Sequence, residues 1–225
     1  MDMTQGYGEG KNPVIDKSEF ILSLFEQLNK NGLGAKEKSI IDRCVALVYE
    51  DYQNGGKLPT LCVLREKLLE QPEKEADNLA LEMELFTDGS LNAFAHKTNV
   101  DTNNRMIVYD IMDLGKQLKT MGLLVITDAM INRVTDNWKK GIRTHVFIDE
   151  FHVVFENEYS GAFFNSAWRR FRKRNAFPSA ITQNVEYLLD SVLASSMLSN
   201  SEYIVMLNQA ASDRQKLAEL LNISN

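Results

Sequence analysis

The amino-acid sequence predicts an α/β protein in which helices flank a mostly parallel sheet and an all-α subdomain is inserted into the chain. After residue 105, apolar runs of strand length alternate with longer amphipathic stretches, which is the rhythm of strand–helix–strand units with right-handed crossovers. Residues 31–104 instead show only the spacing of helices. We therefore expect a core formed by residues 1–30 and 105–225, and an all-α insertion over residues 31–104.

The first half of the chain is expected to contain several helices, because apolar residues recur there at helical spacing and turn signals separate the stretches. Thr60 is the expected N-cap of the third helix, and Pro72 is the expected start of the fourth. The first predicted helix begins at Pro13 and ends at the turn segment 29–34, and the second covers residues 35–52. The third runs from Thr60 to Leu69, and the fourth begins at Pro72 and ends at the turn segment 87–90.

Strands and helices alternate in the second half of the chain. The predicted strands occupy residues 106–111, 144–150, 178–183 and 202–207. A long helix between the first two begins at the cap Asp113 and stops at Gly141. Further helices are predicted at residues 161–175, 184–193 and 210–222.

Composition narrows the classes of function. The net charge of −6 argues against a protein that binds nucleic acid over its whole surface, although not against a local basic patch. The two cysteines are too few for a disulfide framework, which fits a reducing cytoplasmic compartment. The three histidines do not cluster with cysteines at zinc-ligand spacing, and no apolar run has the length of a membrane span.

Two adjacent carboxylates, Asp149 and Glu150, follow the apolar run at residues 146–148. Ionised carboxylates are rarely buried without partners, so we expect this pair where the strand leaves the core. In open α/β sheets that carboxyl end is where ligands bind. An Asp there can hold Mg²⁺ against a nucleotide, and a Glu can orient or deprotonate a water. A strand followed by a solvated acidic turn explains the dipeptide alone equally well.

A nucleotide hydrolase should also contain the phosphate loop G-x-x-x-x-G-K-[ST]. The nearest segment, "GYGEGKN" at residues 6–12, is one residue short and places Asn12 where the Mg²⁺-binding hydroxyl is needed. The other Gly-Lys pairs, at 56–57 and 115–116, are followed by Leu and Gln. An ATPase interpretation therefore requires a chain that begins after the phosphate loop.

Four segments together resemble the conjugative-transfer ATPases of type IV secretion systems, which belong to the RecA-like, FtsK/HerA branch of P-loop NTPases. These segments are "HVFIDEFHVVFENE", "WRRFRKRN", "ITQNVEYLL" and "LNQAASDRQKLAELLNIS". The resemblance runs nearly the whole length of the chain and implies a RecA-like core. It departs from the family where the phosphate-loop strand and helix are missing at the front and the final strands at the back. It thus indicates an excised or truncated piece of a larger ATPase.

The resemblance implies roles for three residues at the ends of strands, with ATP and Mg²⁺ as the cofactors. Asp149 would take the Walker-B role and hold Mg²⁺, and Glu150 would polarise the attacking water. Gln183 would be the sensor that contacts the γ-phosphate or the water. The alternative for Gln183 is a strand-end residue that caps a helix.

Two arginines are candidates for a finger that reaches the nucleotide of a neighbouring subunit in a homo-oligomeric ring. Arg172, in the basic run 169–174, is the first choice because it lies four residues after Trp168. The alternative is a solvated basic face. Arg214 is the rival candidate, and its alternative is an ion pair with Asp213 at a helix start.

The resemblance thus implies a fragment of the ATPase that powers type IV secretion or conjugative transfer, inactive as an isolated chain. Its partners would be the other subunits of that machine, through which it would lie at the cytoplasmic side of the inner membrane. Two alternatives stay open. One is a DNA-translocating motor of the same superfamily, for which the basic helix would contact DNA. The other is a non-catalytic module in which helices 36–87 dock partner subunits.

Overall fold

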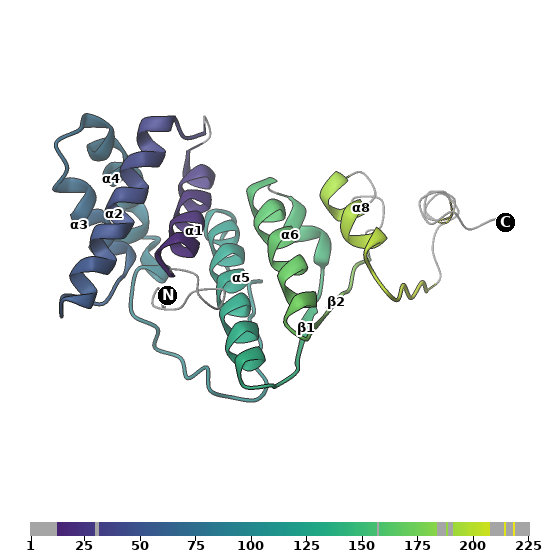
Figure 1. The fold of residues 1–225 in the computed structure, drawn as a ribbon. Coiled ribbons are helices and arrows are strands. Elements are labelled where there is room, and N and C mark those ends of the chain that lie inside the picture. Colours follow the sequence, from purple (N-terminus) through teal and green to yellow (C-terminus); the bar gives the residue numbers. More distant parts are fainter. Residues whose placement is uncertain are drawn as a thin grey trace. The chain divides into compact units, whose positions relative to one another are not determined.

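The computed structural model describes residues 13–29, 32–156, 158–183 and 191–207, together with Leu188, Arg214 and Ala218. The chain divides between Thr135 and Asp136 into two compact units, and each is described by itself (Figure 1). None of the helices in the described ranges is long and apolar enough to cross a membrane.

The first unit is a helical array. Its helices are α1 (Pro13–Leu28), α2 (Ala35–Gln53), α3 (Leu61–Leu69), α4 (Lys74–Thr87), the short 3₁₀ helix η1 (Asn92–Phe94) and most of α5 (Lys116–Lys139). Helices α2, α3 and α4 pack on one another, and α1 packs on α2. The described residues between 32 and 104 contain no strand, as expected. The predicted boundaries between insertion and core stay a prediction.

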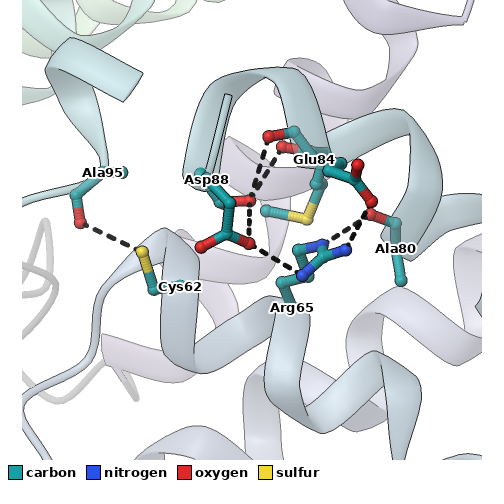
Figure 2. A network of polar contacts seen from close by, with 8 residues as sticks. Cys62, Arg65, Ala80, Glu84, Asp88 and Ala95 are labelled. Carbon is teal, nitrogen blue, oxygen red and sulfur yellow. Dashed lines mark hydrogen bonds and ion pairs between the residues drawn. The ribbon is translucent and has the colours of Figure 1, made fainter. Parts of the chain in front are cut away.

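Apolar stripes at helical spacing form the core of this unit, as the sequence indicates. The buried side chains of α1 and α2 include Phe20, Ile21, Leu24, Phe25, Ile40, Ile41, Cys44, Val45 and Val48. Arg65 of α3 joins α4 through three hydrogen bonds, in which Nε donates to the Ala80 carbonyl and the guanidinium ends donate to Glu84 and Asp88 (Figure 2). Packing of α3 on α4 is thus reinforced by one arginine.

A charged pair is buried in the same unit. Lys17 of α1 donates to both carboxylate oxygens of Asp128 in α5 at 2.7 Å, and the Asn132 amide donates to one of them at 3.1 Å. The Lys17 and Asp128 side chains are 0% and 3% exposed. A buried charge is tolerated only when it is paired and hydrogen-bonded, and this pair meets that condition.

Two predicted caps are confirmed and one is wrong. The Thr60 hydroxyl accepts the Val63 N–H at 3.3 Å, and Gly141 takes φ +71° after α5 while the Ile142 N–H reaches the Asn137 carbonyl at 2.8 Å. Asp113, however, does not cap α5, which begins three residues later at Lys116. The chain turns over residues 112–114 first, so the carbonyl of Gly115 accepts the first intrahelical hydrogen bond, from Lys119.

The second unit contains a parallel strand–helix–strand motif (Figure 1). Strands β1 (Thr144–Ile148) and β2 (Ala176–Ala180) pair in parallel, with Thr144 opposite Ala176 and Ile148 opposite Ala180. Between them come the 3₁₀ helix η2 (Phe151–Phe155) and α6 (Glu158–Lys173), and α8 (Val192–Ser199) follows β2. Helix α6 packs on β2, η2 and α8, and buries Phe164, Ala167 and Phe171.

Two of the four predicted strands are absent. Residues 106–111 and 202–207 have high β propensity, yet neither forms a strand, and side chains such as Met106 (82% exposed) and Val205 (85% exposed) face water. The reason is that a strand forms only where its N–H and C=O groups pair with a neighbouring strand, and in the described part of the chain only β1 and β2 pair. The predicted helices at 184–193 and 210–222 lie largely outside the described residues.

Candidate functional site

Parallel pairing of β1 and β2 brings the predicted site residues to one edge of the sheet. Asp149 and Glu150 directly follow β1, and Gln183 follows β2 by three residues. The Gln183 amide Nε2 donates to Glu150 Oε1 at 3.1 Å. Backbone pairing continues past the strands, because the Ile181 N–H donates to the Ile148 carbonyl at 2.8 Å. The carboxylate and the amide, 33 residues apart in sequence, therefore meet at the carboxyl edge.

Glu150 occupies a backbone conformation that few side chains adopt. Its φ is 48° and its ψ is 47°, in the left-handed region that costs a non-glycine residue about 1–2 kcal/mol. This geometry turns the chain from β1 into η2. The next residue holds the turn in place: the Phe151 N–H donates to the Ile181 carbonyl at 2.9 Å, and its buried ring packs edge-on against Phe155 and Phe164. The residue with the strained backbone is thus itself a candidate functional residue, and such strain is common at active sites.

The carboxylates at this edge are open to water. The Glu150 side chain is 47% exposed, and Asp149 is also exposed. Asp149 Oδ1 accepts the Glu150 N–H at 2.9 Å, which orients one of its oxygens. Glu150 therefore lies where it can receive a proton from a water molecule.

The chemistry of the donors fits a divalent cation only in part. Carboxylate and amide oxygens are the ligands that Mg²⁺ prefers. However, the described residues contain no group of three or more His, Cys, Asp or Glu side chains that could hold a metal ion. Asp149 can thus supply one ligand, and the remaining ligands must be water molecules or phosphate oxygens of a substrate.

Two further side chains, which the sequence analysis did not identify, lie at the same site. His152 Nδ1 lies 3.4 Å from Glu150 Oε2 and 3.3 Å from the Thr182 hydroxyl. The sequence carried a weak signal for them, because His152 follows Glu150 by two residues and Thr182 directly precedes Gln183. The strand register decides that they meet, and the register is visible only in the structure.

Among the described residues, no hydrogen bond or ion pair joins either arginine candidate to Glu150 or Gln183. Arg172 is exposed at the end of α6, four residues before β2 begins, so it lies at the amino edge of the sheet. The five-residue strands separate that edge from Glu150 by roughly 15 Å. Arg214 is exposed, and Asp213, its alternative partner, lies outside the described residues.

Basic residues gather at the amino edge. Lys140 and Arg143 precede β1, and Arg172 and Lys173 precede β2; all four side chains are exposed. The two turns are joined because the Thr144 N–H donates to the Asn175 carbonyl at 3.4 Å. No carboxylate occurs in the sequence at residues 137–148 or 159–183. The sheet is therefore acidic at one edge and basic at the other.

Comparison with known proteins gives a family match and a structural match. A family model described as the TraG P-loop domain matches residues 32–225. The solved structure of VirB4 of Thermoanaerobacter pseudethanolicus is similar, with a TM-score of 0.75 and 19% sequence identity. That match covers 94% of this chain and 62% of the VirB4 chain, so the present chain spans less than two thirds of that protein. No curated protein matches. The structural match confirms the predicted α/β, RecA-like fold.

Proposed function

Because the chain belongs to the TraG P-loop domain family, the conjugative-transfer and type IV secretion ATPases, we propose that it carries the catalytic carboxylates of such an ATPase. The observation that supports this proposal best is the hydrogen bond from Gln183 to Glu150 beside Asp149, at the carboxyl edge of a parallel sheet. ATP and Mg²⁺ are the proposed substrate and metal ion. The parent reaction is hydrolysis of ATP to ADP and phosphate, coupled to assembly of the machine or to transfer through it.

Each of the three residues has a role that its position allows. Asp149 would hold Mg²⁺, directly or through water, and the bound ion would supply positive charge beside the phosphates. Glu150 orients the attacking water and accepts its proton. Its carboxylate is half-exposed, so a water molecule can reach it. Gln183 has an uncharged amide that donates a hydrogen bond to Glu150. Through this contact, binding or loss of the γ-phosphate at Gln183 would affect the position of Glu150.

This chain alone is expected to hydrolyse no ATP. Its sequence contains no phosphate loop, so it offers neither the nest of backbone N–H groups nor the lysine that together bind the phosphates. Loss of these contacts costs several kcal/mol, and about 4 kcal/mol already corresponds to ~1000-fold in rate. We propose that residues upstream in a longer chain supply the loop.

The test compares this chain with a chain extended upstream to include a phosphate loop. We expect calorimetric ATP binding and phosphate release only in the extended chain. Turnover should vanish with Glu150→Gln and persist with Glu156→Gln, a matched change to an exposed carboxylate nearby. Tight ATP binding and Glu150-dependent turnover in the short chain would contradict the proposed need for the loop. Turnover that survives Glu150→Gln in the extended chain would overturn the assignment of Glu150 as the base, whereas an extended parent chain without any turnover would favour a non-catalytic docking role.

Arg172 is proposed to act on the nucleotide of a neighbouring subunit in a ring. Because it lies at the edge opposite to Glu150, it cannot serve the site of its own chain. Mixing extended Glu150→Gln subunits with Arg172→Ala subunits should therefore restore part of the turnover, since one type of interface combines an intact carboxylate with an intact arginine. Arg169→Ala, an exposed arginine on the same helix, is the matched control. Restoration by Arg214→Ala subunits instead would assign the finger to Arg214.

The partners and location of the protein follow from the same proposal. We propose that it works with other subunits of a secretion or conjugation machine and lies in the cytoplasm, held at the inner membrane through those subunits.

The basic amino edge of the sheet supports a second candidate function, a motor that translocates DNA. Exposed cations on two adjoining turns can neutralise consecutive phosphates, and such binding weakens steeply with salt. The combined variant Lys140→Gln, Arg143→Gln and Lys173→Gln should lower DNA affinity and its salt dependence. The charge-matched control changes the exposed residues Lys74, Lys97 and Arg105 to Gln. An equal loss of DNA affinity in both variants would indicate that DNA is attracted by the overall charge of the protein and not by a specific binding surface.

A further inference from the structure

We propose that His152, held by Thr182, is a positioning residue that aims the carboxylate of Glu150 at the attacking water. The proposal rests on the proposed ATPase function and adds a residue that the Asp-Glu and Gln pattern does not reveal. Its basis is the set of contacts around one carboxylate, which come from the segments that follow the two strands of the sheet.

The two oxygens of Glu150 have different partners. Oε1 accepts a hydrogen bond from Gln183 Nε2 at 3.1 Å, and Oε2 lies 3.4 Å from His152 Nδ1. Gln183 lies three residues after the end of β2, whereas His152 is in η2, which follows β1. With a proton on Nδ1 of His152, the carboxylate has a donor on each side, whereas a single contact would leave it free to rotate.

Thr182 fixes the imidazole in turn. Its hydroxyl lies 3.3 Å from the same Nδ1 atom that faces Glu150. Both distances are longer than those of ordinary N–H···O hydrogen bonds, which fits a proton on Nδ1 that is shared between two oxygen acceptors. The His152 side chain is 21% exposed, so solvent competes only in part for this nitrogen. Thr182 directly precedes Gln183, so the segment after β2 contacts both His152 and Glu150.

The arrangement selects one tautomer of His152. An ionised carboxylate only accepts hydrogen bonds, so contact with Glu150 requires that Nδ1 carries a proton. Thr182 then accepts from Nδ1–H through its oxygen and keeps its own proton for another partner. With Nδ1 unprotonated, the lone pairs of nitrogen and carboxylate would face each other and Glu150 would turn away. The tautomer of His152 therefore depends on its contact with the side chain of Glu150.

A general base held in the correct orientation raises the rate of the chemical step, because a larger fraction of the bound complexes is ready to react. The affinity for substrate does not change. Removal of the His152 donor should thus lower kcat and leave the KM for ATP nearly unchanged. Asn is the informative replacement, because its amide nitrogen occupies nearly the position of Nδ1. Gln places its nitrogen nearer to the position of Nε2 and should not substitute.

The first experiment uses this chain and needs no ATP turnover. Nitrogen-15 NMR of the His152 ring near neutral pH should show a protonated Nδ1. Glu150→Gln should shift the population toward the Nε2–H tautomer, and Thr182→Val should do so less, while Thr182→Ser should match the parent chain. An unprotonated Nδ1 in the parent chain, or a tautomer that ignores Glu150→Gln, would overturn the proposal.

The second experiment measures turnover in the extended chain with a phosphate loop. His152→Ala and His152→Gln should lower kcat by about 10-fold or more, and His152→Asn should recover most of it. If Glu150→Gln abolishes turnover while His152→Ala retains the parent kcat, the positioning role fails and the proposed ATPase stands. If Glu150→Gln has no effect, the proposed base itself fails. The two failures are thus distinct.

Discussion

Glu150 combines a strained backbone with an exposed carboxylate, and the two properties can be separated by substitution. At φ 48° a Cβ atom is unfavourable, whereas glycine adopts this region freely. We expect Glu150→Gly to be more stable than Glu150→Ala by about 1 kcal/mol, although both lose the carboxylate. Urea denaturation of the two variants measures the difference. Equal stabilities would show that the left-handed conformation carries no strain.

Two carboxylates on α4 should respond to pH in opposite ways. Burial, reinforced by Glu37, raises the pKa of Glu82, so its contribution to stability is present below the pKa of unfolded glutamate and is lost as pH rises. A hydrogen bond from its own backbone N–H and contact with Lys36 lower the pKa of Glu75, whose contribution is present above the unfolded pKa and lost as pH falls. Hence at pH 7 Glu82→Gln should stabilise the fold and Glu75→Gln should destabilise it. Both differences should fade below about pH 4, as denaturation followed at several pH values would show.

At this scale the sequence indicated residues by their chemical type and could not supply their contacts. Asp149 and Glu150 were identified because their carboxylates follow an apolar run and suit nucleotide hydrolysis, whereas only the resemblance to a known family indicated Gln183. His152 and Thr182 were missed because their role depends on which atoms face each other across two strands. Lys17 was missed as well, since an amphipathic pattern gives no sign that a lysine lies on the buried side of a helix.

Among the elements, helices were more predictable than strands: two of the four predicted strands formed, as β1 and β2, and two did not. Helical periodicity and local caps such as Thr60 depend on neighbouring residues, so α1 to α4 appear close to their expected positions. A strand depends on a distant partner, and so the apolar runs 106–111 and 202–207 remain unpaired although their composition resembles that of β1. Even β2 begins two residues earlier than expected, because its register is set by β1.

The junction of α3 and α4 should depend on the geometry of one guanidinium. Arg65 is 20% exposed and makes three hydrogen bonds in different directions, to Ala80, Glu84 and Asp88 (Figure 2). Lysine keeps the charge but cannot reach three acceptors, so Arg65→Lys should cost about 1 kcal/mol. Lys57→Gln, which breaks an exposed pair with Glu66, should change the free energy of unfolding by less than about 0.5 kcal/mol. Thermal denaturation of both variants measures these changes in the free energy of unfolding. Equal changes would mean that Arg65 contributes only through its charge.

At the scale of the whole molecule, the chain combines a helical unit built from local contacts with a unit whose site depends on long-range pairing. The first unit nevertheless contains an ion pair of very long sequence separation. Lys17 and Asp128 are 111 residues apart, and their pair joins the first helix to the long α5. The stability of this unit should therefore depend on a buried ion pair at its two chain ends.

Removal of one member of this pair should be more harmful than removal of both. Lys17→Met leaves Asp128 as a buried charge without its counter-ion, which typically costs 3–5 kcal/mol, whereas Lys17→Met with Asp128→Leu removes the stranded charge and should cost clearly less. Cys44 provides the readout, because it is fully buried in the same unit and burial raises its pKa to about 11, so its thiol stays unreactive while the unit is folded. We expect labelling of Cys44 by a disulfide reagent to accelerate strongly in Lys17→Met and only modestly in the double variant. A double variant as reactive as the single one would mean that the pair contributes by its own attraction, beyond the penalty of an isolated charge.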